Sequence, residues 1–160
     1  MSKPISALRH YLFHPLMVGG LSLLATGLYA AWGGARLTGE ARYFHFLYLV
    51  PIMAPFVAFL LERAERLPPF KAAAFLIDAG IIGLALSRVF YPVPLVSGHV
   101  LFLTYALLTA RRRVGFALAA LIWLQVLTLK VVFWHDVVTP CGGVILGCVG
   151  ATLFRWSQSE

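Results

Sequence analysis

Long apolar stretches recur from one end of the chain to the other. Six of them approach the length of about 20 residues that an α-helix needs to cross a bilayer. They are continuously apolar, as in 21–25 and 117–121, which favours helices over the alternating strands of a membrane barrel. The predicted spans are about 15–33, 44–61, 72–90, 97–110, 114–134 and 139–156.

The composition excludes an ordinary soluble enzyme. Of the 160 residues, 61% are hydrophobic and 12% are charged, which is about half the charged fraction of a typical soluble domain. No polar linker divides the chain. The sequence therefore predicts an all-α polytopic membrane protein, a six-transmembrane-helix bundle that forms a single transmembrane domain over residues 1–160.

The basic residues predict the orientation of this bundle. Nine Lys/Arg fall before, after or between the spans on the side of the N-terminus, and four fall on the other side. Because basic loops stay in the cytoplasm, we expect both termini to be cytoplasmic. The same rule explains the net charge of +7, so no nucleic-acid partner is expected. Cys141 and Cys148 have neither disulfide-framework nor zinc spacing.

Asp78 is a charged residue inside a predicted span. Such a charge costs several kcal/mol unless it is paired or faces a cavity. Its position about six residues into the third span places it towards the cytoplasmic side. We expect it to pair with an arginine of that side or with a neighbouring helix, and a catalytic role is the less favoured alternative.

A denser polar group falls at the predicted outer ends of the spans. Ser97 is a suitable N-cap, and Gly98 leaves the first-turn N–H groups open to an anion. Taken alone, the tripeptide at 97–99 is better explained by helix capping and packing. The neighbouring cations are Arg88 and Lys130, which would hold a phosphate charge.

Two histidines at the mouths of different helices strengthen the functional interpretation. His99 and His135 suit phosphoryl transfer, since one imidazole can attack phosphorus while the other protonates the leaving oxygen. Solvated interfacial histidines are the alternative. Asp136 follows His135 and is expected either to orient its imidazole or to pair with Arg88, Lys130 or His99.

These residues resemble the type-2 phosphatidic acid phosphatase superfamily of membrane lipid phosphatases and phosphotransferases, whose core has six transmembrane helices. The family motif P-S-G-H at the start of the fourth helix resembles residues 96–99, and the motif S-R-x5-H-x3-D resembles residues 128–139. The resemblance implies that His135 is the nucleophile, that His99 protonates the leaving alcohol and that Ser97 and Gly98 hold phosphate oxygens.

The chain departs from the family pattern at several positions. Val96 replaces the proline, and Thr139 stands in the aspartate position while an aspartate occurs at 136. Lys130 lies one position later than the family arginine. The first family motif, K-x6-R-P, is absent, and Arg88 is its stand-in.

The resulting hypothesis is a lipid phosphatase or phosphotransferase that acts on a lipid phosphate through a phosphohistidine. No metal or other cofactor is implied, and the partners are the substrate and membrane lipids. The expected location is a bacterial inner membrane, with the site on the periplasmic face. Two alternatives stay open: a non-catalytic membrane protein that binds lipid or a partner helix, and a small transporter or channel with Asp78 and Lys130 as pathway charges.

Overall fold

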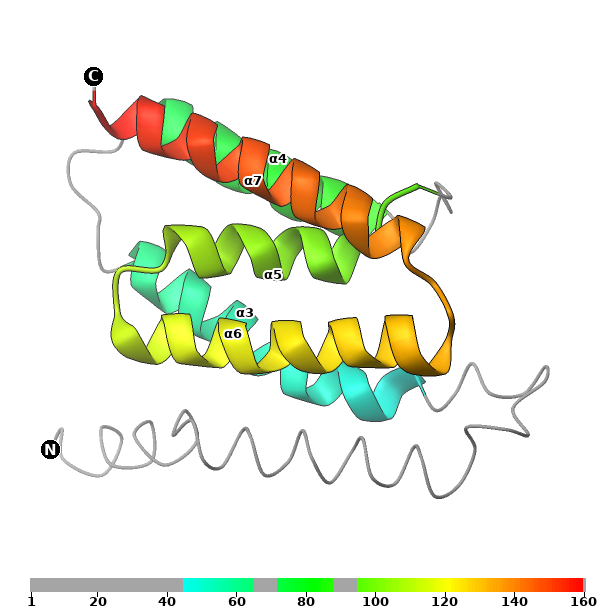
Figure 1. Ribbon diagram of the computed structural model, residues 1–160. Coiled ribbons are helices and arrows are strands. Elements are labelled where there is room, and N and C mark those ends of the chain that lie inside the picture. The colour runs from blue at the N-terminus through cyan, green and yellow to red at the C-terminus, as the bar shows by residue number, and fades with distance from the viewer. Residues whose placement is uncertain (1–44, 65–71, 88–94, 160) are drawn as a thin grey trace, which may run out of the picture.

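The computed structural model describes residues 45–64, 72–87 and 95–159, and all its regular structure there is helical. The helices are α3 (His45–Ala64), α4 (Ala72–Ser87), α5 (Gly98–Thr109), α6 (Arg113–Thr128) and α7 (Val138–Ser159), and a π-helical segment, η2 (Leu129–Phe133), follows α6. Consecutive helices run in opposite directions (Figure 1). The first predicted span, 15–33, lies outside the described residues.

Five of the predicted spans coincide with these helices to within a few residues. Two helical segments are long and apolar enough to cross a membrane, Arg113–Val132 of 20 residues and Val138–Ser159 of 22 residues. The helix α5 has only 12 residues, a length of about 18 Å at 1.5 Å per residue. Residues 97–110, which were predicted to span a membrane, therefore form a helix shorter than the roughly 20 residues that a transmembrane helix needs.

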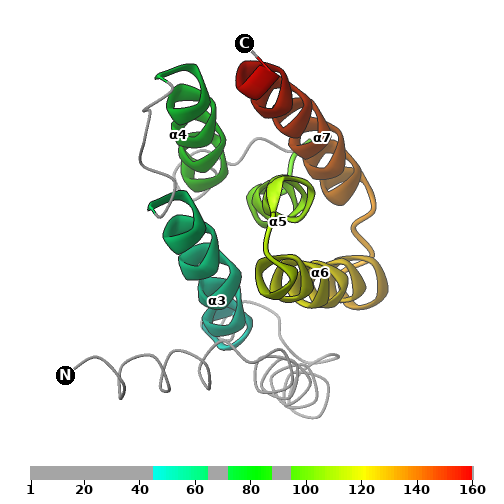
Figure 2. The same cartoon turned by 90° about the vertical axis from the view of Figure 1, so that its left-hand side faces the viewer.

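The helix α5 forms the centre of the bundle, with α3, α4, α6 and α7 arranged around it (Figure 2). Nine of its twelve residues are buried, and Val100, Leu101, Leu103 and Tyr105 are completely so. Between α5 and α6, Trp123 Nε1 donates a 2.9 Å hydrogen bond to Thr104 Oγ1. An apolar helix surrounded in this way is the core helix of the bundle.

The outward faces of the other helices carry large apolar side chains. Leu76 on α4 is 67% exposed, Leu124 on α6 is 57% exposed and Ile145 on α7 is 63% exposed. Many exposed large apolar side chains on several helices are typical of a surface that meets lipid or another protein.

The bundle has two ends that we name by one residue each. The Ser97 end holds the start of α5, η2 and the start of α7. The Arg111 end holds the end of α3, the start of α4, the α5–α6 turn and the end of α7 (Figure 1).

Candidate functional site

The first element of the predicted site is the start of α5. Ser97 is the N-cap, with φ −89° and ψ 114°, and its Oγ accepts a long 3.5 Å hydrogen bond from the Val100 N–H. Ser97 is 4% exposed and Gly98 is buried. His99 follows in the first turn of α5 and is half-buried. The hydroxyl of Ser97 thus performs the capping role that the sequence allowed.

The start of α7 lies directly against the start of α5. The Ser97 N–H donates a 2.8 Å hydrogen bond to the Thr139 carbonyl. A Cβ at Gly143 would lie 2.8 Å from the Ser97 carbonyl oxygen, and one at Gly142 would lie 2.0 Å from that of Leu95. Only glycine permits such a close approach of the two backbones. The two segments that resemble the family motifs are therefore in contact.

A polar cluster lies where the chain turns from η2 into α7, and we call this turn, residues 130–139, the corner. Lys130 Nζ lies 3.1 Å from Asp136 Oδ2 and 3.1 Å from Thr139 Oγ1. The Thr139 N–H donates to Asp136 Oδ1 at 3.1 Å, and the Thr139 hydroxyl donates to Asp136 Oδ2. Of the partners considered for Asp136, the structure thus provides Lys130.

The environment of Asp136 favours its charged form. Partial burial raises the pKa of its carboxyl group, but the hydrogen bonds from Thr139 and the hydrogen bond and charge of Lys130 outweigh this effect. The net result is a pKa below the usual 3.8. Asp136 therefore remains a carboxylate at neutral pH.

The π-helical segment shapes this corner. The Trp134 N–H donates at 3.1 Å to the carbonyl of Leu129, five residues earlier, and the Asp136 N–H donates at 2.9 Å to that of Lys130. His135 is exposed and has φ 52°, a left-handed conformation that costs a non-glycine residue about 1 kcal/mol. Backbone strain of this kind often occurs at functional sites.

The predicted site is thus brought together in part. The structure places Ser97, Gly98 and His99 on one side of the α5–α7 contact, and Lys130, His135 and Asp136 belong to the corner on the other side. Arg88 lies outside the described residues. Within the part of the chain that the structure describes, no group of three or more His, Cys, Asp or Glu residues could hold a metal ion.

A second polar cluster lies at the Arg111 end. Asp78 Oδ2 is 2.9 Å from Arg63 Nε, and its Oδ1 accepts a hydrogen bond of 2.5 Å from the Tyr105 hydroxyl. The Arg63 guanidinium lies over the Phe59 and Phe154 rings, 4.5 and 4.1 Å from their centroids. The expected pairing of Asp78 with an arginine of this side is confirmed, and it joins α3, α4 and α5.

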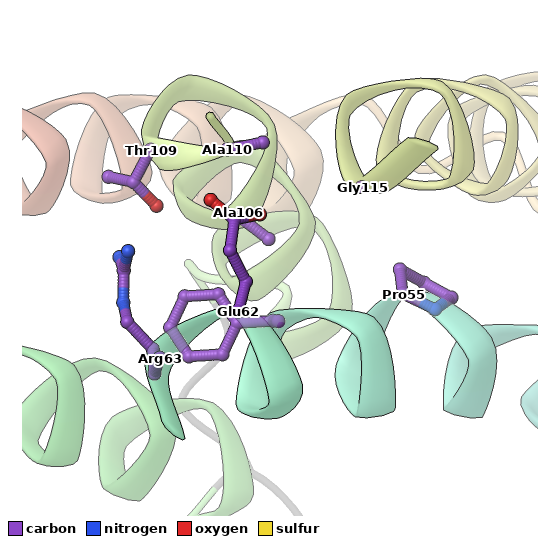
Figure 3. Close-up of a pocket in the computed structure, with 8 residues that line it drawn as sticks. Pro55, Glu62, Arg63, Ala106, Thr109, Ala110 and Gly115 are labelled. Atoms are coloured by element: carbon purple, nitrogen blue, oxygen red, sulfur yellow. The ribbon is translucent and has the colours of Figure 1, made fainter. Parts of the chain in front are cut away.

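Glu62 is a buried acid that the sequence analysis did not single out. It is 7% exposed, and its Oε1 accepts a 2.7 Å hydrogen bond from the Arg111 N–H. Figure 3 shows Glu62 and Arg63 both reaching from α3 towards the end of α5. They line a cavity of about 10 Å³ with Thr109 and Gly115, close to the minimum for one water molecule. The available signal was the acid-base pair at 62–63 beside a predicted span end.

The two ends differ in what they can do chemically. The Ser97 end combines a lysine, an exposed histidine and a second histidine on an adjoining helix, which are groups that can bind and attack a phosphate. At the Arg111 end, Asp78 pairs with Arg63 and Tyr105 and thereby joins three helices. Searches against protein-family models, curated proteins and solved structures found no match.

Proposed function

We propose that the chain is an integral membrane protein, a six-helix bundle with both termini in the cytoplasm and the Ser97 end outside. The length of α6 with η2 and of α7 supports insertion in a membrane. The three arginines at 111–113 lie at the opposite end, as the cytoplasmic excess of basic residues requires. In a bacterium, this arrangement puts the Ser97 end on the periplasmic face of the inner membrane.

We further propose that the Ser97 end carries the site of a lipid phosphatase or phosphotransferase. The observation that supports this function is the 2.8 Å hydrogen bond from the Ser97 N–H to the Thr139 carbonyl. It joins the Ser97-Gly98-His99 segment to the segment that contains Lys130 and His135, although more than 30 residues separate them. The resemblance to type-2 phosphatidic acid phosphatases rests on these two segments.

The reaction proceeds in two steps. A nitrogen of His135 attacks the phosphorus of a lipid phosphate, forming an N–P bond while the P–O bond to the lipid breaks. His99, in its imidazolium form, gives its proton to the departing alkoxide oxygen. Water or another alcohol then attacks the phosphohistidine, loses its proton to the now neutral His99 and releases the phosphoryl group from His135. Neither step uses a metal.

The corner residues support this chemistry electrostatically. Lys130 is the cation for the phosphate oxygens, and its bonds to Asp136 and Thr139 hold its ammonium group in place. The N–H groups in the first turn of α5 and the helix dipole favour the same negative charge. Arg88 is the further cation that this proposal includes.

A second function is a non-catalytic protein that binds lipid at the same corner. It is favoured by the existing engagement of the polar groups: Ser97 Oγ caps α5, and the Lys130 charge is already balanced by Asp136. In this case His99 and His135 are interfacial residues.

Release of phosphate from detergent-solubilised protein without added metal distinguishes the two functions. The substrates are phosphatidate, phosphatidylglycerophosphate and polyprenyl phosphates and diphosphates. We expect release that survives a chelator and is abolished by His135→Gly and by His99→Gln. Because glycine accepts the positive φ at 135, His135→Gly should fold at least as stably as the native chain.

Exogenous imidazole tests the role of His135 directly. If His135 is the nucleophile, imidazole should restore part of the turnover to His135→Gly. A ³²P-lipid should also label the native chain, and the label should be both acid-labile and alkali-stable, as a phosphohistidine is. Folded native protein that releases no phosphate from any of these lipids and acquires no ³²P label would overturn the enzyme and leave the binding function.

A further inference from the structure

A second cavity opens at the Arg111 end, opposite to the proposed phosphatase corner. It has a volume of about 270 Å³ and lies between the end of α5 and the last turns of α7. Leu108 and Phe154 provide its apolar part, and Arg111, Arg155 and Gln158 provide its polar part. The two arginines come from opposite sides of the cavity, one from the α5–α6 turn and one from α7.

Arg155 has a defined orientation in this cavity. Its Nη2 donates a 2.9 Å hydrogen bond to the Leu108 carbonyl near the end of α5. A planar guanidinium that uses one nitrogen in this way still presents other N–H donors in a fixed fork. Arg111 is fixed through its backbone, since its N–H donates to Glu62 at 2.7 Å. The fold thus holds the guanidinium of Arg155 and the backbone of Arg111 at this cavity.

With the membrane orientation proposed above, the surrounding surface would lie at the depth of lipid headgroups. On α7, Leu153 is 45% exposed, and Trp156, one residue beyond Arg155, is 65% exposed. Tryptophan favours the boundary between hydrocarbon and headgroups, so the outward apolar face of α7 ends where the arginine begins. Arg112 and Arg113, which follow Arg111 in the chain, are exposed cations at the same end of the bundle.

We propose that this cavity binds the phosphate-bearing headgroup of an anionic phospholipid of the cytoplasmic leaflet. Arginine suits a phosphate because two of its N–H groups can donate to two oxygens at once. The adjoining Leu108 and Phe154 give an apolar wall for the start of the lipid chains. This site differs from the proposed substrate site in its residues and in the leaflet that it faces, so it holds whether or not the Ser97 end is catalytic.

The competing explanation is local and structural. Arg155 lies near the carboxyl end of α5, where a cation is stabilised by the helix dipole. If this were its only role, Arg155→Gln would weaken the binding of an anionic lipid no more than the loss of any other surface arginine at this end.

Native mass spectrometry of the purified full chain tests the proposal. Phosphatidylglycerol and phosphatidylcholine with identical acyl chains are titrated separately, and we expect tighter binding of phosphatidylglycerol. Arg111→Gln and Arg155→Gln should each weaken the binding of phosphatidylglycerol about fivefold, the value for one basic residue near an anionic surface. The double variant should weaken it about 25-fold.

Arg113→Gln is the matched control, because it removes the same charge from the same turn but does not line the cavity. We expect it to change the affinity less than twofold. If all three single variants weakened the binding of phosphatidylglycerol equally, diffuse attraction to the basic surface would explain the binding. That result would overturn the proposal. Equal binding of the two lipids, or displacement of phosphatidylglycerol by millimolar inorganic phosphate, would also overturn it.

Two further measurements keep the test decisive. If Arg155→Gln fails to fold, Arg155→Lys replaces it, because lysine retains the charge without the forked N–H donors of a guanidinium. We expect Arg155→Lys to bind phosphatidylglycerol two- to threefold more weakly than the native chain. Arg111→Gln then tests the loss of charge by itself. Phosphate release by Arg111→Gln should equal that of the native chain, which separates this lipid site from the proposed phosphatase function.

Discussion

Asp78 joins three helices at the Arg111 end. It accepts from Arg63 and Tyr105 together, so Asp78→Asn leaves a mostly buried guanidinium without its counter-charge. Breaking such a pair costs about 3 kcal/mol, and we expect the free energy of unfolding to fall by about this amount in denaturant titrations in detergent. Tyr105→Phe, which removes only a hydroxyl, should cost about 1 kcal/mol. Equal stability of Asp78→Asn and the native chain would contradict the structure.

Asp136 makes the Ser97 end sensitive to acid. Its pKa lies below the usual 3.8 in the folded chain, so its contribution to stability is fully present above that pH. This contribution is lost as the pH falls through the lower folded value. We expect the difference in melting temperature between the native chain and Asp136→Asn to be constant from pH 7 to pH 5 and to shrink below about pH 4. A difference that stayed unchanged at pH 3 would exclude the stabilising role.

Single residues differ in how well the sequence could predict them. The pairing of Asp78 followed from the cost of an unpaired charge in a span. The partner of Asp136 did not follow, because the neighbours of a residue at a helix end depend on where that helix stops and how it turns. Glu62 and Tyr105 were missed because a carboxylate near a basic loop and a tyrosine in an apolar helix are both common in exposed positions.

Glycines determine how closely the helix α7 approaches α5. A Cβ at Gly147 would lie 2.6 Å from that of Thr104, and one at Gly143 would lie 2.8 Å from the Ser97 carbonyl oxygen. We therefore expect Gly143→Ala and Gly147→Ala to lower the free energy of unfolding by about 1–3 kcal/mol. Gly83→Ala on α4 is the control, since nothing lies within 4 Å of its added methyl group. Because alanine favours a helix over glycine by about 1 kcal/mol, Gly83→Ala should not lower the stability. A loss of similar size at Gly83 would show that contact between α7 and α5 is not the cause.

The positions of the helices were largely predictable, and their local geometry was not. Apolar stretches bounded by charges and prolines gave the positions of α3 to α7 to within a few residues. The π-helical turn of η2 left no mark in the hydropathy of 114–134, because it changes only which carbonyl accepts each N–H. The central position of α5 depends on contacts with four other helices, and its composition resembles that of a lipid-facing helix.

The orientation of the whole bundle can be measured with two introduced cysteines. In a chain with Cys141→Ala and Cys148→Ala, Val137→Cys marks the Ser97 end and Arg113→Cys marks the Arg111 end. Both positions are exposed. With a membrane-impermeant maleimide, we expect Val137→Cys to react in intact cells and Arg113→Cys to react only after the cells are opened. The reverse pattern would show an inverted bundle, with the Ser97 end in the cytoplasm.

At the scale of the whole molecule, charge bias and apolar length predicted alternating helices whose odd and even connections lie at opposite ends. The structure shows this alternation across α3 to α7 (Figure 1). The sequence predicted the assembly of the Ser97 end only as a possibility. This assembly requires close contacts between glycines of α7 and the backbone of α5, and the sequence does not indicate which residues of α5 these glycines meet. The helix α5 contributes to both ends of the bundle: the Ser97 cap is at its start, and Tyr105 lies further along it.

The π-helical turn at 129–133 is equivalent to one residue inserted into an α-helix. Deleting Val132 would return this stretch to an uninterrupted α-helical register, move Asp136 one position nearer to Lys130 and redirect every side chain of the corner. The long helices on either side would keep their sequences. The deletion of a single codon would therefore convert a chain with this polar corner into one with a plain helical hairpin. Both chains could insert in the membrane in the same way.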